Sequence, residues 1–228
     1  MKAKRILATA LAVTLIAVMM FEASVQISAA AQVSATEGYP QEAPAIPKDE
    51  LTFLTNEQLE ELIKNAPCKT ETRSAQTLAN RRITESELAT WIEEYWELGG
   101  ISGFELEVVR LINIEREKYN LQPLKINPNL MMAARFHSQQ MADLNFFSHR
   151  SPHHGRGIYR AEMFGHENIQ EHVWGVRENI AGSIRSPQAV VQAWMNSPGH
   201  RAAILGDVYL TIGVGAVQGG GTTAKFGS

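Results

Sequence analysis

The sequence contains a single cysteine, Cys68, among its 228 residues. No internal disulfide can form, so the fold depends on its hydrophobic core, and the thiol either stays free or pairs with another molecule. Two catalytic motifs are also missing. There is no G-x-S-x-G motif, and the run H-E-N-I-Q-E-H around Glu167 lacks the spacing of H-E-x-x-H.

Long apolar runs are scarce, and the one at the N-terminus has the form of an export signal. A basic start precedes an apolar run over residues 6–21, and small residues at 28–31 offer a cleavage site. A membrane anchor is the alternative, but the run is short for a span and Glu22 interrupts it. We predict a signal peptide over residues 1–30, secretion, and no stable membrane span after cleavage.

Positive charge is not in excess. The formal net charge is −3, and removal of residues 1–30, with three basic residues and Glu22, shifts it to −5. Nucleic-acid binding requires a basic patch, so we expect no nucleic-acid partner.

Three segments follow the export signal. Residues 31–50 are rich in Ala, Pro, Gln and Glu, which predicts a disordered linker. Residues 51–100 hold two amphipathic helices, each opened by a Thr-x-x-Gln or Thr-x-x-Glu capping box. We interpret them as an N-terminal helical extension of the main domain, which spans 101–228.

The main domain begins with helices and ends with a hairpin. Apolar periodicity and capping residues predict helices over residues 104–119, 128–144 and 187–195. Strands are predicted over residues 211–218 and 222–227, joined by a run of glycines. This order indicates an α+β domain in which helices cover a small antiparallel sheet.

Three polar residues far apart in the chain form a candidate site. The stretch Ala193–Leu205 reads A-W-M-N-S-P-G-H-R-A-A-I-L and places His200 directly after a sharp Ser-Pro-Gly turn. His137 lies on the apolar face of a predicted helix, and Glu178 opens E-N-I-A-G, which we interpret as a turn. Two imidazoles and a carboxylate suit a divalent metal, above all Zn²⁺. Alternatively, each is a core residue with its own hydrogen-bond partner.

Five of the seven histidines lie between His149 and His172. Their irregular spacing favours a solvated loop over a metal-binding lip, because it matches no compact zinc motif. The pairs Ser197–His200 and Ser148–His149 are too common by chance to indicate a serine hydrolase.

Several motifs in the expected order resemble the CAP superfamily. They are H-S-Q-Q-M-A at His137, F-F-S-H ending at His149, E-N-I-A-G at Glu178, and W-M-N-S-P-G-H-R-A-A-I-L followed by I-G-V-G-A. This superfamily groups cysteine-rich secretory proteins, venom allergens and plant pathogenesis-related proteins with secreted bacterial relatives. The resemblance covers about residues 104–227. It implies an α–β–α sandwich, export, and a central cavity lined by two His and two Glu, with His137, Glu178 and His200 at three of these positions.

The chain departs from the family pattern at the second glutamate. Asn196 and Ser197 stand where relatives carry it, so the expected tetrad is at most a triad unless Glu167 supplies the missing carboxylate. Ser197 and His149 are the further residues that we expect at the cavity.

The resemblance leaves three functional interpretations. The first is a secreted, non-enzymatic bacterial protein whose cavity binds a divalent metal such as Zn²⁺ or a small ligand, and whose surface binds envelope, lipid or host components. The second is a metal-dependent hydrolase in which the two histidines hold Zn²⁺ and Glu178 is a third ligand or a general base. In the third, the cavity residues are structural and residues 51–100 recognise a partner.

Overall fold

The structure is a computed structural model that describes residues 54–65, 81–97, 100–166, 175–182 and 186–228. The predicted export signal, the linker, Cys68 and Glu167 lie outside these residues. In chain order the elements are α2 (Asn56–Asn65), α3 (Glu85–Glu97), α4 (Gly103–Glu117), β1 (Lys125–Ile126), α5 (Pro128–Asp143), α6 (Gly157–Met163), β2 (Val176–Ala181), α7 (Pro187–Asn196), α8 (Pro198–Ile204), β3 (Thr211–Val217) and β4 (Gly221–Gly227). Within the described part of the chain, no helix has the length and apolar character needed to cross a membrane.

One four-stranded sheet organises the main domain, in the order β1-β3-β4-β2. The terminal hairpin β3–β4 is antiparallel as predicted, and β2 extends it as an antiparallel edge strand. The two-residue strand β1 runs parallel to β3, so the sheet is mixed and not purely antiparallel. The α+β class is confirmed.

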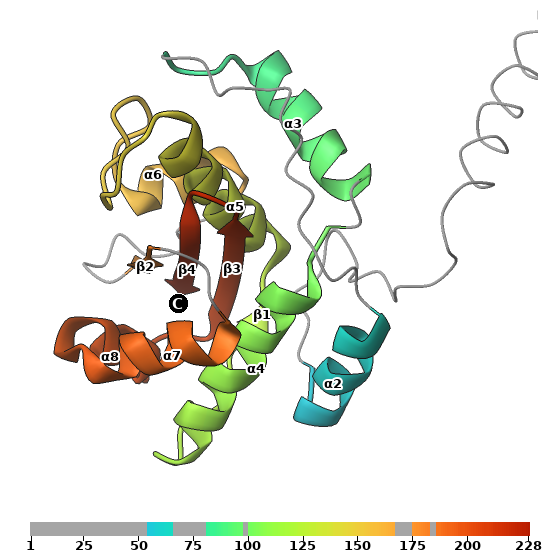
Figure 1. Cartoon of the computed structure of the whole chain (residues 1–228), viewed down its shortest axis with the longest axis vertical. Helices are drawn as coiled ribbons and strands as arrows, with labels where there is room; N and C mark the ends of the chain where they lie inside the picture. Colours follow the sequence, from blue (N-terminus) through green and yellow to red (C-terminus); the bar gives the residue numbers. More distant parts are fainter. Residues whose placement is uncertain (1–53, 66–80, 98–99, 167–174, 183–185) are drawn as a thin grey trace, which may run out of the picture. The chain divides into compact units, whose positions relative to one another are not determined.

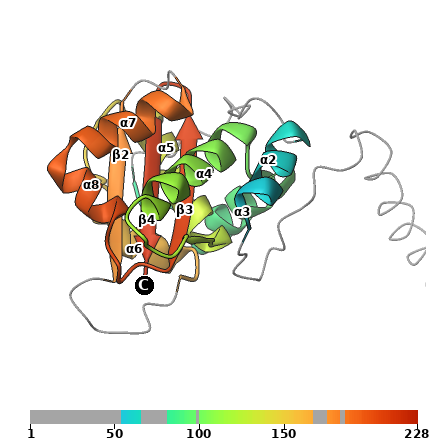
Figure 2. The ribbon, with the colours of Figure 1, turned by 90° about the horizontal axis from the view of Figure 1, so that it is seen from below.

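Helices cover both faces of this sheet (Figures 1 and 2). Helix α5 packs along β3 and β4 on one face, while α4 contacts β3, and α7 and α8 contact β2, on the other. This arrangement is the expected α–β–α sandwich. Helix α2, from the N-terminal extension, packs against α4.

Two glycines of β3 let α5 lie directly on the sheet. A Cβ added at Gly213 would stand 2.1 Å from the backbone carbon of Leu130, and one at Gly215 would stand 2.0 Å from the backbone nitrogen of Arg135. No side chain fits in that space. The close approach fixes the position of α5 and, with it, of His137.

The helix starts follow the predicted caps. The Asn127 side chain accepts hydrogen bonds from the backbone of Asn129 and Leu130 at the start of α5. Ser186 caps α7 in the same way, through the backbone nitrogen of Ala189. In the extension, the capping box Thr84–Glu87 is also present.

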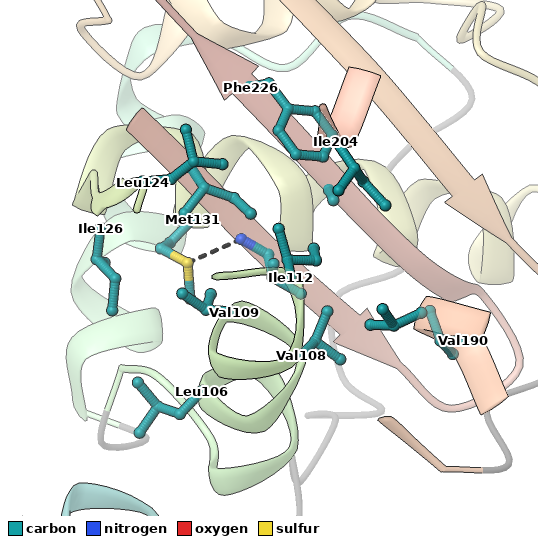
Figure 3. Packing of buried hydrophobic residues seen from close by; sticks show 14 of the residues in the cluster. Leu106, Val108, Val109, Ile112, Leu124, Ile126, Met131, Val190, Ile204 and Phe226 are labelled. Carbon is teal, nitrogen blue, oxygen red and sulfur yellow. Dashed lines mark hydrogen bonds between the residues drawn. The ribbon is translucent and has the colours of Figure 1, made fainter. Parts of the chain in front are cut away.

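Apolar side chains between α4 and the sheet form the main core (Figure 3). Val108 and Ile112 of α4, Val190 of α7, Ile204 of α8 and Phe226 of β4 are buried together in it. The helix predicted over residues 104–119 ends at Glu117, so Tyr119 lies beyond the end of α4 and is more than half exposed.

A buried ion pair joins three elements beside this core. Glu105, at the third position of α4, completes a capping box with Ser102 and also pairs with Arg135 of α5. Its carboxylate accepts a further hydrogen bond from the backbone nitrogen of Ala216 in β3 at 2.9 Å. The pair therefore fixes α4 and α5 to the sheet.

Gly215→Ala should destabilise the protein by at least about 1–3 kcal/mol, because the added methyl group would overlap the α5 backbone. Gly199→Ala is the matched control. It has open space around its Cα within α8, so alanine there should be neutral or stabilising. Urea unfolding of both variants measures the difference, and an equal effect would contradict the close approach.

Candidate functional site

Glu178 lies in the edge strand β2 and not in a turn. The prediction of a turn at E-N-I-A-G was wrong, because Val176–Ala181 pairs with β4 over its whole length. In this register Glu178 stands directly opposite Lys225, and residues directly opposite on paired strands point to the same face.

Four hydrogen bonds reach the Glu178 carboxylate from three side chains. Lys225 Nζ donates to Oε2 at 2.5 Å. Arg160 Nη2, from α6, donates to Oε2 at 2.8 Å and to Oε1 at 3.0 Å. His149 Nδ1 donates to Oε1 at 3.1 Å. The side chains of Arg160 and Lys225 are fully buried, so two buried cations share one carboxylate.

These contacts set the ionisation of the group. Burial opposes the ionised form of Glu178, but Lys225, His149, Arg160 and His137 outweigh it and hold the pKa of this carboxyl well below its ordinary value. Burial lowers the pKa of Lys225 to about 8, although Glu178 acts in the opposite direction. At neutral pH both groups are charged, and the cluster of Glu178, Arg160 and Lys225 keeps one uncompensated positive charge.

His137 is fully buried on α5, as its place on the apolar face of this helix predicted. Its Nε2 donates to the backbone oxygen of Ser148 at 3.0 Å and lies 3.7 Å from Glu178 Oε1. Burial, with added repulsion from Arg160 and Lys225, lowers the pKa of His137 to about 3 against the pull of Glu178. The ring is therefore neutral, and its Nδ1 is buried with no hydrogen-bond partner among the described residues.

Among the described residues, no side-chain hydrogen bond or ion pair joins His200 or Ser197 to this cluster. Both lie at the start of α8, where Ser197 is the N-cap and makes no side-chain capping bond. The backbone oxygen of His200 accepts a hydrogen bond from Asn179 Nδ2 at 3.0 Å. In the part of the chain that the structure describes, no hydrogen bond or ion pair links the His200 ring to Glu178. Burial and the charge of His149 lower the pKa of His200.

Because Gly157 has no side chain, the start of α6 can lie directly against Glu178 and Lys225. A Cβ at Gly157 would lie 2.9 Å from Glu178 Oε2 and 3.1 Å from Lys225 Nζ. Its backbone oxygen also accepts a hydrogen bond from Lys225 Nζ at 3.2 Å. The first residue of α6 thus forms one wall of the ion-pair cluster.

These residues do not fit a zinc ion. Both oxygens of Glu178 accept hydrogen bonds from cationic groups, and His137 Nε2 is committed to a carbonyl oxygen. A divalent ion would also be repelled by Arg160 and Lys225. Among the described residues, no three His, Cys, Asp or Glu side chains are placed to hold a metal ion. The zinc site stays a prediction that this arrangement does not support.

Comparison with known proteins places the fold in a family. The model of the CAP family, described as the cysteine-rich secretory protein family, matches residues 109–226, which is half of the chain. This chain belongs to the CAP family. The matched segment contains the sheet except its last residue, Gly227, and it includes His137, His149, Arg160 and Lys225, the residues placed around the Glu178 carboxylate.

Bacterial proteins are among its relatives. YkwD of Bacillus subtilis (strain 168) is 44% identical over 120 residues, which cover 53% of this chain and 45% of YkwD. The membrane protein YlbC of the same strain is 36% identical over 111 residues, 49% of this chain and 31% of YlbC. The crystal structure of an extracellular protein containing an SCP domain from Bacillus anthracis is 31% identical, with a TM-score of 0.51, and the match covers 55% of this chain and 40% of that one. The match spans less than half the length of each of these three proteins.

Sequence reasoning missed both cations of the CAP-domain site. Lys225 carried a usable indication: it is a lysine inside a short apolar strand, and a buried lysine needs an acidic partner. No such indication exists for Arg160, because it lies in the irregular histidine-containing region, where no helix was predicted.

Two substitutions in the cluster should differ sharply in how much they lower the free energy of unfolding. Glu178→Gln leaves two buried cations without a counter-charge, so it should cost about 3–5 kcal/mol of stability. Lys225→Met removes the surplus charge and leaves the Arg160–Glu178 pair matched, so it should cost less than half as much. Urea unfolding of both variants measures the two values. Equal losses of stability in the two variants would contradict an excess of positive charge around the Glu178 carboxylate.

Proposed function

We propose that this chain is an exported bacterial CAP-domain protein that acts by binding and not by catalysis. The observation that carries this proposal is the state of Glu178, whose two oxygens are held by Lys225, Arg160 and His149. A carboxylate in this state is a poor metal ligand and a poor general base. A general base needs a free lone pair and a pKa near the working pH.

The same reasoning weighs against the alternative of a metal-dependent hydrolase. His137 is buried, neutral and bonded through Nε2 to a backbone oxygen, and the described residues include no group of three His, Cys, Asp or Glu side chains that could hold a metal ion. A metal-activated water would need these three residues as ligands together. Their arrangement supports a scaffolding role for His137 and a binding role for the exposed part of the cluster.

The charge of the cluster favours a small ligand with an anionic group. Arg160 and Lys225 exceed the single carboxylate by one positive charge, and low-dielectric surroundings extend the reach of that charge. The His149 side chain, which is bonded to Glu178, is 55% exposed and connects the cluster with the protein surface. Phosphate or carboxylate groups of lipids or other envelope components have the required chemistry.

Two observations support export. Residues 1–30 have the layout of a cleavable export signal. The similar SCP-domain protein from Bacillus anthracis is described as extracellular. An exported protein of this kind would meet its ligand in the cell envelope or outside the cell.

A titration of the purified chain with inorganic phosphate, followed by NMR of the histidine side chains, tests the proposed ligand class. Phosphate should shift the His149 resonances saturably. Lys225→Met should abolish the shift, because it removes the surplus charge of the cluster. Lys125→Met, at an exposed lysine of β1, is the matched control and should leave the shift unchanged.

A parallel calorimetric titration with Zn²⁺ should show no saturable binding that depends on His137 and His200. Saturable zinc binding that disappears in the His137→Ala/His200→Ala variant would overturn the proposal and favour the hydrolase. A phosphate response that persists in Lys225→Met would overturn the proposed ligand class alone.

A further inference from the structure

The N-terminal extension rests on the CAP domain through a second apolar cluster. Trp91 of α3 stands edge-on to Phe136 of α5 and Phe164, with ring centroids 5.6 Å and 5.5 Å apart. Tyr95 of α3 is buried in the same cluster, and the guanidinium of Arg135 lies over its ring at 4.7 Å. The α3 residues of this cluster precede residues 109–226, the segment that matches the CAP family.

A histidine makes the polar part of this contact. His154 is almost fully buried, and its Nε2 accepts a hydrogen bond from the backbone nitrogen of Ile83, just before α3, at 3.3 Å. Arg82 Nε adds a hydrogen bond to the backbone oxygen of His153 at 3.0 Å. Two neighbouring residues of the loop thus bind two neighbouring residues of the extension.

The hydrogen bonds of His154 define its protonation. Because Nε2 accepts from an N–H group, the neutral ring carries its proton on Nδ1. The side-chain amide of Gln140 lies 2.6 Å from Nδ1, and an amide can present its oxygen there by a simple flip. A protonated ring would instead carry a hydrogen on Nε2, pointing at the Ile83 N–H. Two donors would then face each other, and the hydrogen bond would be lost.

We propose that His154 is an acid-sensitive latch, so that protonation of its ring releases α3 from the CAP domain. The charged and titratable groups that face this ring are Arg82 from the extension, His153 from the same loop and Arg160 from α6. Gln140 and Phe136, which contact the ring from α5, are uncharged. The surroundings therefore disfavour a positive ring while α3 is docked.

The pH range of release follows from the ring's ionisation. Burial and the positive charges of Arg82, His153 and Arg160 lower the pKa of His154 to about 4. Once α3 leaves, burial by the extension and the charge of Arg82 no longer act on the ring, so its pKa rises to near the ordinary value of about 6.5. The released form therefore takes up the proton more readily, and docking weakens as pH falls through this range. Between pH 7 and pH 4 the opening constant of α3 should rise about 100-fold.

Release of α3 should also affect the ion-pair cluster of Glu178, Arg160 and Lys225. His154 belongs to the loop that continues back to His149, and Arg160 donates hydrogen bonds to the backbone oxygens of His149 and Gly155. The same guanidinium holds Glu178. Loss of the His154 contact removes one of the attachments of this loop, so the loop should loosen together with α3.

Hydrogen–deuterium exchange of the full chain at pH 7, 5 and 4, corrected for intrinsic exchange rates, tests the latch. Peptides from residues 85–97 should lose protection by about 100-fold between pH 7 and pH 4, and peptides from 146–156 should follow them. Peptides from the centre of α5 should stay protected, which separates release from global unfolding.

Two variants complete the experiment. His154→Gln keeps an oxygen acceptor for the Ile83 N–H but does not titrate, so the pH dependence of α3 exchange should disappear. His153→Gln, at the adjacent histidine, is the control and should retain most of this pH dependence, because burial and Arg82 still lower the pKa of His154. Trp91→Ala, which removes the apolar contact, should release α3 at pH 7 already.

Three results would overturn the latch. They are an unchanged pH dependence in His154→Gln, an α3 that exchanges freely at pH 7 in the unaltered protein, and a loss of α5 protection in parallel with α3.

Discussion

The structure of this CAP domain depends on one carboxylate that is shared by two buried cations. Glu178 comes from the edge strand β2, Lys225 from the adjacent strand β4, and Arg160 from α6. The three side chains thereby fix α6 to the sheet and hold the loop at His149. A cluster with surplus positive charge also limits the chemistry of the site. It repels metal cations, and burial together with repulsion from Arg160 and Lys225 keeps the nearby His137 neutral.

Local rules predicted most of the fold. Asn127-Pro128 and Ser186-Pro187 are strong helix starts, because the cap accepts backbone hydrogen bonds and proline fits the first helical position. The glycine run of residues 219–221 indicates a turn between two short strands, and in the structure the turn is at residues 218–220, directly before β4 begins at Gly221. Each of these features is decided by a few neighbouring residues, so the sequence alone suffices.

The site itself was only half predictable. His137, His149 and Glu178 are brought together, as the family motifs suggested, while within the described part of the chain no hydrogen bond or ion pair joins His200 or Ser197 to Glu178. The partners Arg160 and Lys225 were missed because their contacts depend on strand register and on the placement of α6, which are set by distant parts of the chain. Glu178 was assigned to a turn because Asn and Gly favour turns, whereas pairing with β4 decides the outcome.

The helical extension makes a second set of contacts with the CAP domain. Its α3 contacts the domain through aromatic rings and through His154, which belongs to the same loop as His149. Scaffolds of one family host different functions through such additions. Here the addition connects the N-terminal part of the chain to the residues that surround the cluster.

The most direct test of the central claim is an NMR titration of the Lys225 side-chain ammonium, with Lys225→Met to assign its signal. If Lys225 is buried against Glu178, its ammonium should be protected from solvent exchange at neutral pH and should titrate with a pKa of about 8. A pKa near 10.4, as in a solvated lysine, with rapid solvent exchange, would contradict the buried cluster and remove the basis of the proposed binding role.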